Sequence, residues 1–228
     1  MIGLTRYRNF RHQKAFRLIP SKYPPIDLYE DVASPDQLEA VFYVESLTNP
    51  RLSEEVGDFS RVPVKDRLVG IPHCSYVMAA FTHINPDGSR FTSGDFGAYY
   101  CAPDINTGIK ETIYHIERIF GYTDEPAQDI HMRSLVTFFS AALVDITDKD
   151  AVASSLYHAT SYTDSQAFGI KVKNEREDGI VYESVRHPGH ECFALFRPNL
   201  VTEVCQGEHY CYKWNGSSIH NVMKMIMA

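Results

Sequence analysis

Residues 97–121 read GAYYCAPDINTGIKETIYHIERIFG and join a short alternating segment to a longer amphipathic one. The side chains of a β-strand point alternately to its two faces. The first six residues, GAYYCA, follow this pattern and predict a strand with Tyr100 on one face, between two alanines. Tyr99 and Cys101 lie on the other face of the same predicted strand.

The second part of this stretch predicts a helix. Asp104 or Thr107 supplies its N-terminal cap, and Gly121 marks its end. The apolar stripe of the helix consists of Ile109, Ile113, Ile116 and Phe120. Glu111 lies on the opposite side of the helix, which separates it from the side that packs into the core. The helix therefore presents a carboxylate directly after the predicted strand.

Two further strands are predicted in the second half of the chain. Residues 179–186, GIVYESVR, alternate and are expected to place Tyr182, Ser184 and Arg186 on one face. Residues 192–196, CFALF, are continuously apolar, as expected for a strand in the middle of a sheet. Helices and strands are mixed rather than strictly alternating. This pattern predicts an α+β fold with a central mixed β-sheet flanked by helices.

The N-terminal part of the chain is rich in turn signals, because prolines recur throughout its first 72 residues. Ser34 is a predicted helix N-cap with Pro35 at the first helical position. Residues 76–84, YVMAAFTHI, form either a buried helix or a strand, since periodicity does not separate the two. This part predicts an irregular helical elaboration with too few core residues for a separate domain. Residues 1–228 are therefore predicted to form a single domain.

Composition and charge exclude several classes of protein. Hydrophobic residues make up 44% of the chain and charged residues 22%, which excludes a disordered, collagen-like or coiled-coil protein. The formal net charge of -7 argues against direct nucleic-acid binding, because phosphate contacts need clustered Lys and Arg. The longest apolar stretch, residues 135–144, is far shorter than the roughly 20 residues of a membrane span. The N-terminus lacks the apolar segment of a secretory signal. The five cysteines are scattered, which predicts reduced thiols. Both observations lead us to expect a cytoplasmic protein.

The first group of residues that could carry chemistry is Arg90, Tyr100 and Glu111. A guanidinium pairs bidentately with pyrophosphate, an aromatic ring stacks on a planar ring, and a carboxylate stabilises the cation that forms when a ribosyl C–N bond breaks. Each residue also has an ordinary structural role. Arg90 could be a solvated loop residue and Tyr100 a core residue, while Glu111 could pair with His115 or Arg118 on an exposed helix face.

Ser184 and Arg186 form the second group, since a hydroxyl and a guanidinium on an inward strand face need partners or a function. The alternative is a sheet edge whose polar face meets water. Potential metal ligands form two further groups, His187, His190 and Cys192, and Cys205, His209 and Cys211. Neither group has the ligand spacing of zinc sites, so no metal is expected. The chain also lacks the G-x-S-x-G, P-loop and G-x-G-x-x-G motifs, which argues against those hydrolases and nucleotide-binding folds.

Three blocks of this sequence together resemble the RES-domain proteins, the toxins of RES–Xre toxin–antitoxin systems. The blocks are FRLIPSKYPP from residue 16, SRFTSGDFGAYYCAPDINTGIKETIYHIERIF from residue 89, and DGIVYESVRHPGHECFALFRP from residue 178. They span about residues 16–198. The chain departs from compact members by a helical insertion at about 23–77 and a C-terminal extension at about 203–228. It also has Thr92 where many members have Asn.

The resemblance implies an ADP-ribosyltransferase-like fold and a reaction on NAD. It places the catalytic Arg, Tyr, Glu and Ser of the family on Arg90, Tyr100, Glu111 and Ser184. The residues expected to bind NAD are Arg17, Arg90, Tyr100 and Arg186. Arg17 matches the opening arginine of the family, and Arg186 shares the predicted strand face of Ser184.

The implied function is an NAD-degrading toxin, an NAD glycohydrolase or NAD phosphorylase that cleaves the nicotinamide–ribose bond. NAD is its substrate, inorganic phosphate is a candidate co-substrate, and no metal is needed. The implied partner is an Xre-type helix-turn-helix antitoxin, within a complex in which the toxin could also be a homo-oligomer. No membrane partner is expected. Two alternatives stay open: a protein ADP-ribosyltransferase that uses NAD, and a non-catalytic interaction module that docks an antitoxin.

Overall fold

The computed structural model describes residues 6–226, apart from 31, 33, 48, 50 and 149–152. The described residues form a seven-stranded sheet in the order β2-β5-β4-β3-β6-β7, with β1 also paired to β3. The strands are β1 (Tyr7–Pro20), β2 (Tyr99–Cys101), β3 (Gln128–Asp145), β4 (Gly179–Glu183), β5 (Glu191–Leu195), β6 (Val201–Trp214) and β7 (Ile219–Met225). The β3–β4 pair is parallel and the other pairs are antiparallel. The predicted α+β fold with a mixed sheet is confirmed.

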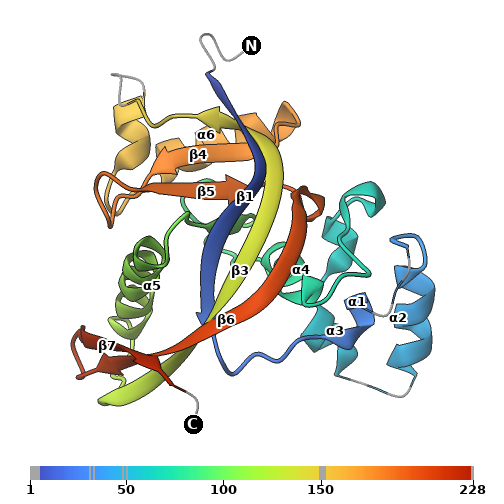
Figure 1. The fold of residues 1–228 in the computed structure, drawn as a ribbon, viewed down its shortest axis with the longest axis horizontal. Coiled ribbons are helices and arrows are strands. Elements are labelled where there is room, and N and C mark those ends of the chain that lie inside the picture. The colour runs from blue at the N-terminus through green and yellow to red at the C-terminus, as the bar shows by residue number, and fades with distance from the viewer. Residues whose placement is uncertain are drawn as a thin grey trace.

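The sheet has a long-stranded part and a short-stranded part. β3 pairs with β1 and β6 along most of its length but with β4 only at Val144 and Asp145. The short strands β4, β5 and β2 continue from that junction (Figure 1). A further antiparallel bridge joins Phe16 to Ala102 and brings β1 beside the end of β2. This bridge positions β1 next to the predicted Tyr100 strand.

The long strands hold the larger apolar core. The apolar stretch at 135–144 forms the second half of β3, where Leu135, Phe139 and Leu143 are fully buried. Phe139 packs its ring against Phe10 and Phe193, with ring centroids 5.9 and 5.1 Å apart. Deep burial of large side chains of this kind supplies most of the free energy that stabilises a fold.

Helix α5 (Ile105–Phe120) follows β2 as predicted. Asp104, and not Thr107, is its N-cap, because the carboxylate Oδ1 accepts a hydrogen bond from the Thr107 backbone N–H at 2.9 Å. The predicted isoleucine stripe packs on Leu18, Met132 and Tyr212. Gly121 is the C-cap. Helix α6 (Thr163–Asn174), which the sequence patterns do not predict, lies near β4 in Figure 1.

The N-terminal region contains α1 (Asp27–Glu30), α2 (Leu38–Ser46), α3 (Leu52–Val56) and α4 (Cys74–Thr82). These helices lie on the other side of the long strands from α5 (Figure 1). The ambiguous run at 76–84 is thus mostly helical. Four short 3-10 helices complete the described elements: η1 (Phe59–Arg61), η2 (Val64–Asp66), η3 (Ala153–Tyr157) and η4 (Pro198–Leu200).

Two predicted boundaries are wrong. Ser34 is not a helix cap, because residues 34–37 form a turn closed by the Gln37 N–H and the Ser34 carbonyl oxygen at 3.1 Å. Helix α2 begins later, with Gln37 as its N-cap. The strand predicted over 179–186 ends at Glu183. The Ser184 Oγ accepts hydrogen bonds from the backbone N–H groups of Arg186 and His187, and these local bonds turn the chain out of the sheet.

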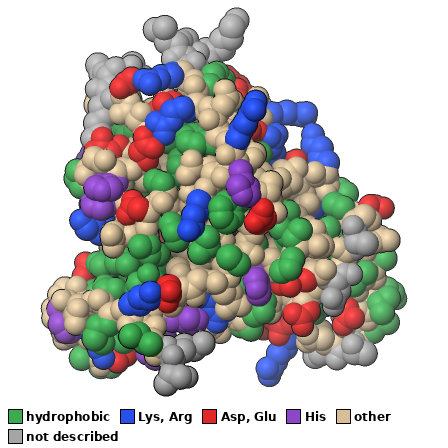
Figure 2. Space-filling view, in the orientation of Figure 1, with side chains coloured by type: hydrophobic (Ala, Val, Ile, Leu, Met, Phe, Trp, Pro, Cys, Tyr) green, Lys and Arg blue, Asp and Glu red, His purple; other side chains and the backbone are tan. Residues whose placement is uncertain are grey.

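Charge on the surface is mixed. On the face shown in Figure 2, basic and acidic side chains are interspersed, with apolar side chains between them. None of the helices in the described chain is long and apolar enough to cross a membrane.

Candidate active site

A cavity of about 220 Å³ lies between β1, β2 and α5. Four of the six predicted site residues line it: Arg17, Arg90, Tyr100 and Glu111. Ser184 reaches the cavity through a hydrogen bond, because its Oγ donates to Glu111 Oε1 at 2.6 Å. Five segments thus meet at the cavity: β1, the loop before β2, β2 itself, α5 and the β4–β5 loop. The fold therefore brings together residues that are far apart in the sequence.

Arg90 lies in the loop between α4 and β2 and is 8% exposed. The turn that leads to it requires glycine, since Gly88 has φ of +70° and a Cβ there would lie 2.2 Å from the Thr92 carbonyl oxygen. The Arg90 Nη1 donates to two carbonyl oxygens, of Leu156 and His158, both at 3.1 Å. The guanidinium also lies 4.7 Å from the ring centre of Tyr162.

Tyr100 holds the Arg90 loop in place. Its Oη accepts hydrogen bonds from the Phe91 N–H at 3.0 Å and from the Ser89 Oγ at 2.7 Å. Burial raises the pKa of Tyr100, although the hydrogen bonds from the loop oppose this effect. Tyr100 therefore remains a neutral phenol, and its hydroxyl positions the residues on either side of Arg90.

Arg17 enters the cavity from β1. Its Nη1 donates to the Tyr100 carbonyl oxygen at 2.9 Å, and its guanidinium lies 4.9 Å from the ring centre of Tyr99. The Nε–H is buried and has no hydrogen-bond partner among the described residues. A buried donor of this kind is costly unless a ligand satisfies it.

Glu111 and Ser184 form the acidic side of the cavity. Ser184 is 2% exposed, and its hydroxyl both donates to Glu111 and accepts the two backbone N–H groups of its own loop. Burial raises the pKa of the Tyr182 hydroxyl and the Cys192 thiol, and the charge of Glu111 raises both further. Both groups stay protonated beside the carboxylate.

The positive charges at the cavity have only neutral partners. Carbonyl oxygens and aromatic rings contact Arg17 and Arg90, and no carboxylate of the described chain forms an ion pair with either. Charged groups withdrawn from water are stable only when paired or well hydrogen-bonded. The arrangement therefore favours an anionic ligand between the guanidinium groups, with Glu111 close by.

Arg186 is placed elsewhere. It does not line this cavity in the described structure, and its guanidinium lies 3.3 Å from the ring centre of Tyr114. It also donates to the Ala159 carbonyl oxygen. Its predicted role in binding NAD stays a prediction.

The lining residues that the sequence does not predict as site residues include His115 and Tyr162. His115 follows Glu111 by one helical turn, and this spacing is a usable signal. Desolvation lowers the pKa of His115, and Glu111 partly opposes this effect. Tyr162 lies in the loop before α6 and has no local signature.

A second cavity of about 690 Å³ adjoins the first. Arg17, Ser89 and Tyr100 line both cavities. The second cavity is also lined by α4, by the loop between α4 and β2, and by residues 23–26, which belong to the predicted insertion. Together the two cavities have the size of a site for an extended ligand.

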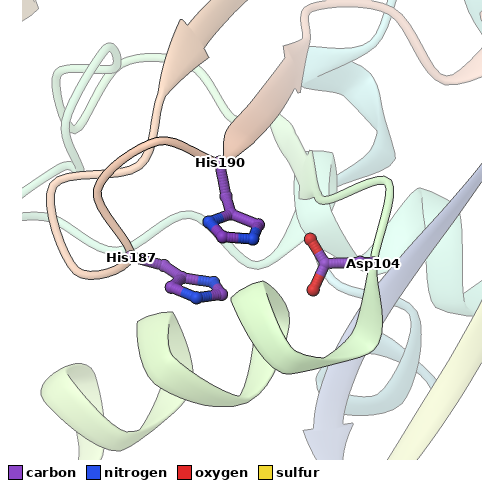
Figure 3. A group of neighbouring side chains, drawn as sticks. All are labelled: Asp104, His187 and His190. Atoms are coloured by element: carbon purple, nitrogen blue, oxygen red, sulfur yellow. The ribbon is translucent and has the colours of Figure 1, made fainter.

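In the structure the potential metal ligands form other groups than those predicted from the sequence. His187 and His190 lie beside Asp104 (Figure 3), whereas Cys192 is buried in the sheet core. Cys211 lies beside Asp129 and His131. Cys205 is exposed.

Comparison with known proteins places this chain in a family. The model of the RES domain matches residues 67–215, so the chain belongs to the RES domain family. The match includes β6, while α1, α2 and α3 precede it and β7 follows it.

The uncharacterized protein y4oC of Sinorhizobium fredii is 30% identical over 204 residues, which cover 90% of this chain and 84% of that protein. A solved structure, the M. tuberculosis MbcT–MbcA toxin–antitoxin complex, contains a chain with a TM-score of 0.38 and 11% identity. That similarity covers 57% of this chain and 74% of the other.

Proposed function

We propose that this protein is an NAD-degrading toxin that cleaves the nicotinamide–ribose bond of NAD. The observation that carries the proposal is the single cavity that combines Arg17 and Arg90 with the Glu111–Ser184 pair. Membership of the RES domain family supports it, since the family resemblance implies the same reaction.

In this proposal the two arginines bind the pyrophosphate of NAD. The guanidinium groups of Arg17 and Arg90 supply donors that match phosphate oxygens. The nicotinamide ribose occupies the smaller cavity beside Glu111. The adenosine half extends past Tyr100 into the larger cavity, which suits the length of a dinucleotide.

The reaction breaks the C–N bond between the ribose and the nicotinamide ring. The bonding electrons leave with the ring nitrogen and neutralise its positive charge, so the leaving group needs no proton. Glu111 stabilises the positive charge that develops on the ribose. Ser184 holds the carboxylate in position through its hydrogen bond. A C–O bond then forms with water, which loses a proton, or with inorganic phosphate. None of these steps needs a metal.

An NAD-consuming enzyme is harmful to the cell that makes it, so the proposal includes an inhibitor. The family resemblance implies an Xre-type antitoxin, and we assign it a position over the cavity. A carboxylate of the antitoxin can pair with Arg90, whose partners among the described residues are all neutral. Co-expression should then restore growth, and the purified complex should release little nicotinamide. Full activity in a stable complex would mean that the antitoxin binds elsewhere.

The direct cellular test is the NAD pool after induction of this chain alone. The proposal predicts that the pool falls within the induction period. Glu117→Gln is a suitable control for a Glu111→Gln variant and should lower the NAD pool as the wild type does. Glu117 also lies on α5, but it accepts a hydrogen bond from the Ile219 N–H at 2.7 Å, outside the cavity. An unchanged NAD pool, with soluble folded protein present, would favour the non-catalytic interaction module instead.

A further inference from the structure

Asp104, His187 and His190 form a compact group outside the cavity (Figure 3). Asp104 precedes α5, and the two histidines lie in the loop between β4 and β5. One potential ligand atom from each side chain lies within 4.8 Å of those from the other two. Asp104 and His187 are half-buried while His190 is exposed, so the group is accessible from solvent.

The hydrogen bonds around His187 set its tautomer. The Thr107 hydroxyl donates its one hydrogen to Asp104 Oδ2 at 2.6 Å. The 2.7 Å contact between the Thr107 Oγ1 and His187 Nδ1 therefore uses a hydrogen on the ring nitrogen. This leaves the lone pair on His187 Nε2. Metal-binding histidines are oriented by the same kind of hydrogen bond from the other ring nitrogen.

His190 has the same arrangement. Its Nδ1 lies 3.3 Å from the Pro188 carbonyl oxygen, which can only accept a hydrogen bond. The free lone pair of His190 is therefore also on Nε2. The two rings stack with centroids 3.5 Å apart and planes within 7°. Such close stacking is compatible with two neutral imidazoles and would be opposed by charge on both.

We propose that Asp104, His187 and His190 bind a divalent cation of the zinc class, with water completing its coordination. Two imidazoles and one carboxylate are a known type of zinc ligand set with an open position. Zinc–ligand distances are about 2.0–2.2 Å, so the side chains must draw together and the stacked rings must turn apart on binding.

The bound cation would connect two parts of the candidate active site. Asp104 is the cap of the helix that carries Glu111, and His187 follows Ser184 in its loop. A cation bound by Asp104 and His187 together would therefore clamp the Glu111 helix to the Ser184 loop. Metal binding itself does not depend on the proposed NAD chemistry.

The second group, Asp129, His131 and Cys211, provides an internal control. The carboxylate of Asp129 forms an ion pair with Lys213 across the β3–β6 ladder. A cation at this group would have to displace Lys213 and deprotonate Cys211. We therefore expect the second group to bind zinc more weakly.

The test is a zinc titration of the metal-free full-length chain, followed by calorimetry, with Co²⁺ absorption as a second readout. We expect one Zn²⁺ per chain, lost in His187→Ala and His190→Ala and kept in His131→Ala. Thr107→Val retains all three ligands but removes the bridging hydroxyl, and should weaken binding by about 10–100-fold. Circular dichroism checks that each variant is folded.

Three outcomes would overturn the proposal. The wild-type chain could bind no zinc, folded His187→Ala and His190→Ala could bind it as tightly as wild type, or His131→Ala could abolish binding. The last result would place the cation at the Asp129 group. None of these measurements uses NAD turnover, so the proposal can fail independently of the proposed enzyme activity.

Discussion

The arginines at the cavity and two arginines elsewhere in the fold, Arg8 and Arg197, are held in different ways. Arg8 on β1 makes a bidentate ion pair with Glu191, with N–O distances of 2.8 and 2.6 Å. Arg197 pairs with Asp178. Arg17 and Arg90, in contrast, contact carbonyl oxygens and aromatic rings.

This difference, together with the position at the cavity, distinguishes Arg17 and Arg90 from the paired arginines. Neutral partners alone are not sufficient, because Arg133 and Arg186 also contact only uncharged groups among the described residues and lie outside the smaller cavity. Where the protein supplies a carboxylate, the guanidinium is already neutralised and contributes to the fold. Where the protein supplies only carbonyl oxygens and aromatic rings, the positive charge of the guanidinium remains available to an anion. The apolar residues also differ between the two regions. The large side chains of the long strands pack against one another, while the aromatic rings at the cavity contact the guanidinium groups. The predictions below test this division between scaffold and site.

The largest effect is expected in the scaffold. Phe139→Ala removes a fully buried ring between Phe10 and Phe193 and should lower the free energy of unfolding by about 3–5 kcal/mol. Denaturant titration measures this loss. The folded fraction of the variant should keep its turnover number for NAD. A large fall in turnover per folded molecule would show that the long strands and the cavity are not separable.

The next effect is expected at Glu111. Glu111→Gln keeps the side-chain shape but removes the charge that stabilises the transition state. Nicotinamide release should fall by an amount equivalent to about 2.7–4 kcal/mol of barrier, with NAD binding and unfolding free energy little changed. Glu117→Gln is the matched control and should retain activity. Near wild-type kinetics in Glu111→Gln would make Glu111 an ordinary helix-surface carboxylate.

A smaller effect is expected for Arg90 and provides the closest test of the arginine comparison. Arg90→Ala should weaken NAD binding by about 1.5–3 kcal/mol, the usual contribution of hydrogen bonds to a charged group. Arg8→Ala loses its ion pair with Glu191 and its contact with the buried carboxylate of Asp145, so its stability should fall, but its NAD affinity should not change. Calorimetric titration with NAD measures both affinities.

Arg90→Lys keeps a positive charge and serves as the folding control, because truncation of a buried side chain can disturb the surrounding loop. It should bind NAD with an affinity between those of wild type and Arg90→Ala. If Arg90→Ala and Arg8→Ala bind NAD equally well, the contrast between the two kinds of arginine has no functional meaning.

The smallest effect concerns pH. Desolvation lowers the pKa of His115 from its ordinary value of 6.5, so the ring is neutral at pH 7 and leaves the charge of Glu111 uncompensated. As pH falls below 6.5 and through the lowered pKa, the ring gains a proton and a positive charge beside Glu111. Nicotinamide release should then decline by a few-fold in wild type. His115→Gln should flatten this part of the pH profile, and an identical profile in the variant would exclude His115 as its source.

The sequence predicts the part of the fold whose signals are local. Asp104, the isoleucine stripe and Gly121 mark α5 clearly, and the apolar run at 192–196 marks β5. The sequence does not predict the pairing of β3 with β1 and β6, because this pairing is non-local. The β6–β7 hairpin is local, but its two strands are also not predicted. β1, β3 and β6 also contain register shifts that interrupt simple alternation.

The site was predictable only in part for the same reason. The order of Arg90, Tyr100 and Glu111 along the chain and the family resemblance identify those residues. The contact between Arg17 and the Tyr100 carbonyl oxygen depends on the bridge between β1 and β2. Ser184 reaches Glu111 because its loop leaves the sheet, which alternation alone does not predict. Tyr162 comes from a loop with no recognisable pattern.

The most direct test is incubation of the purified chain with NAD, with and without inorganic phosphate, followed by quantification of all products. The account predicts one free nicotinamide for each NAD consumed. The other product should be ADP-ribose if water is the acceptor, or phosphorylated ADP-ribose if phosphate is the acceptor. Intact NAD after prolonged incubation with folded protein, under both conditions, would contradict the account.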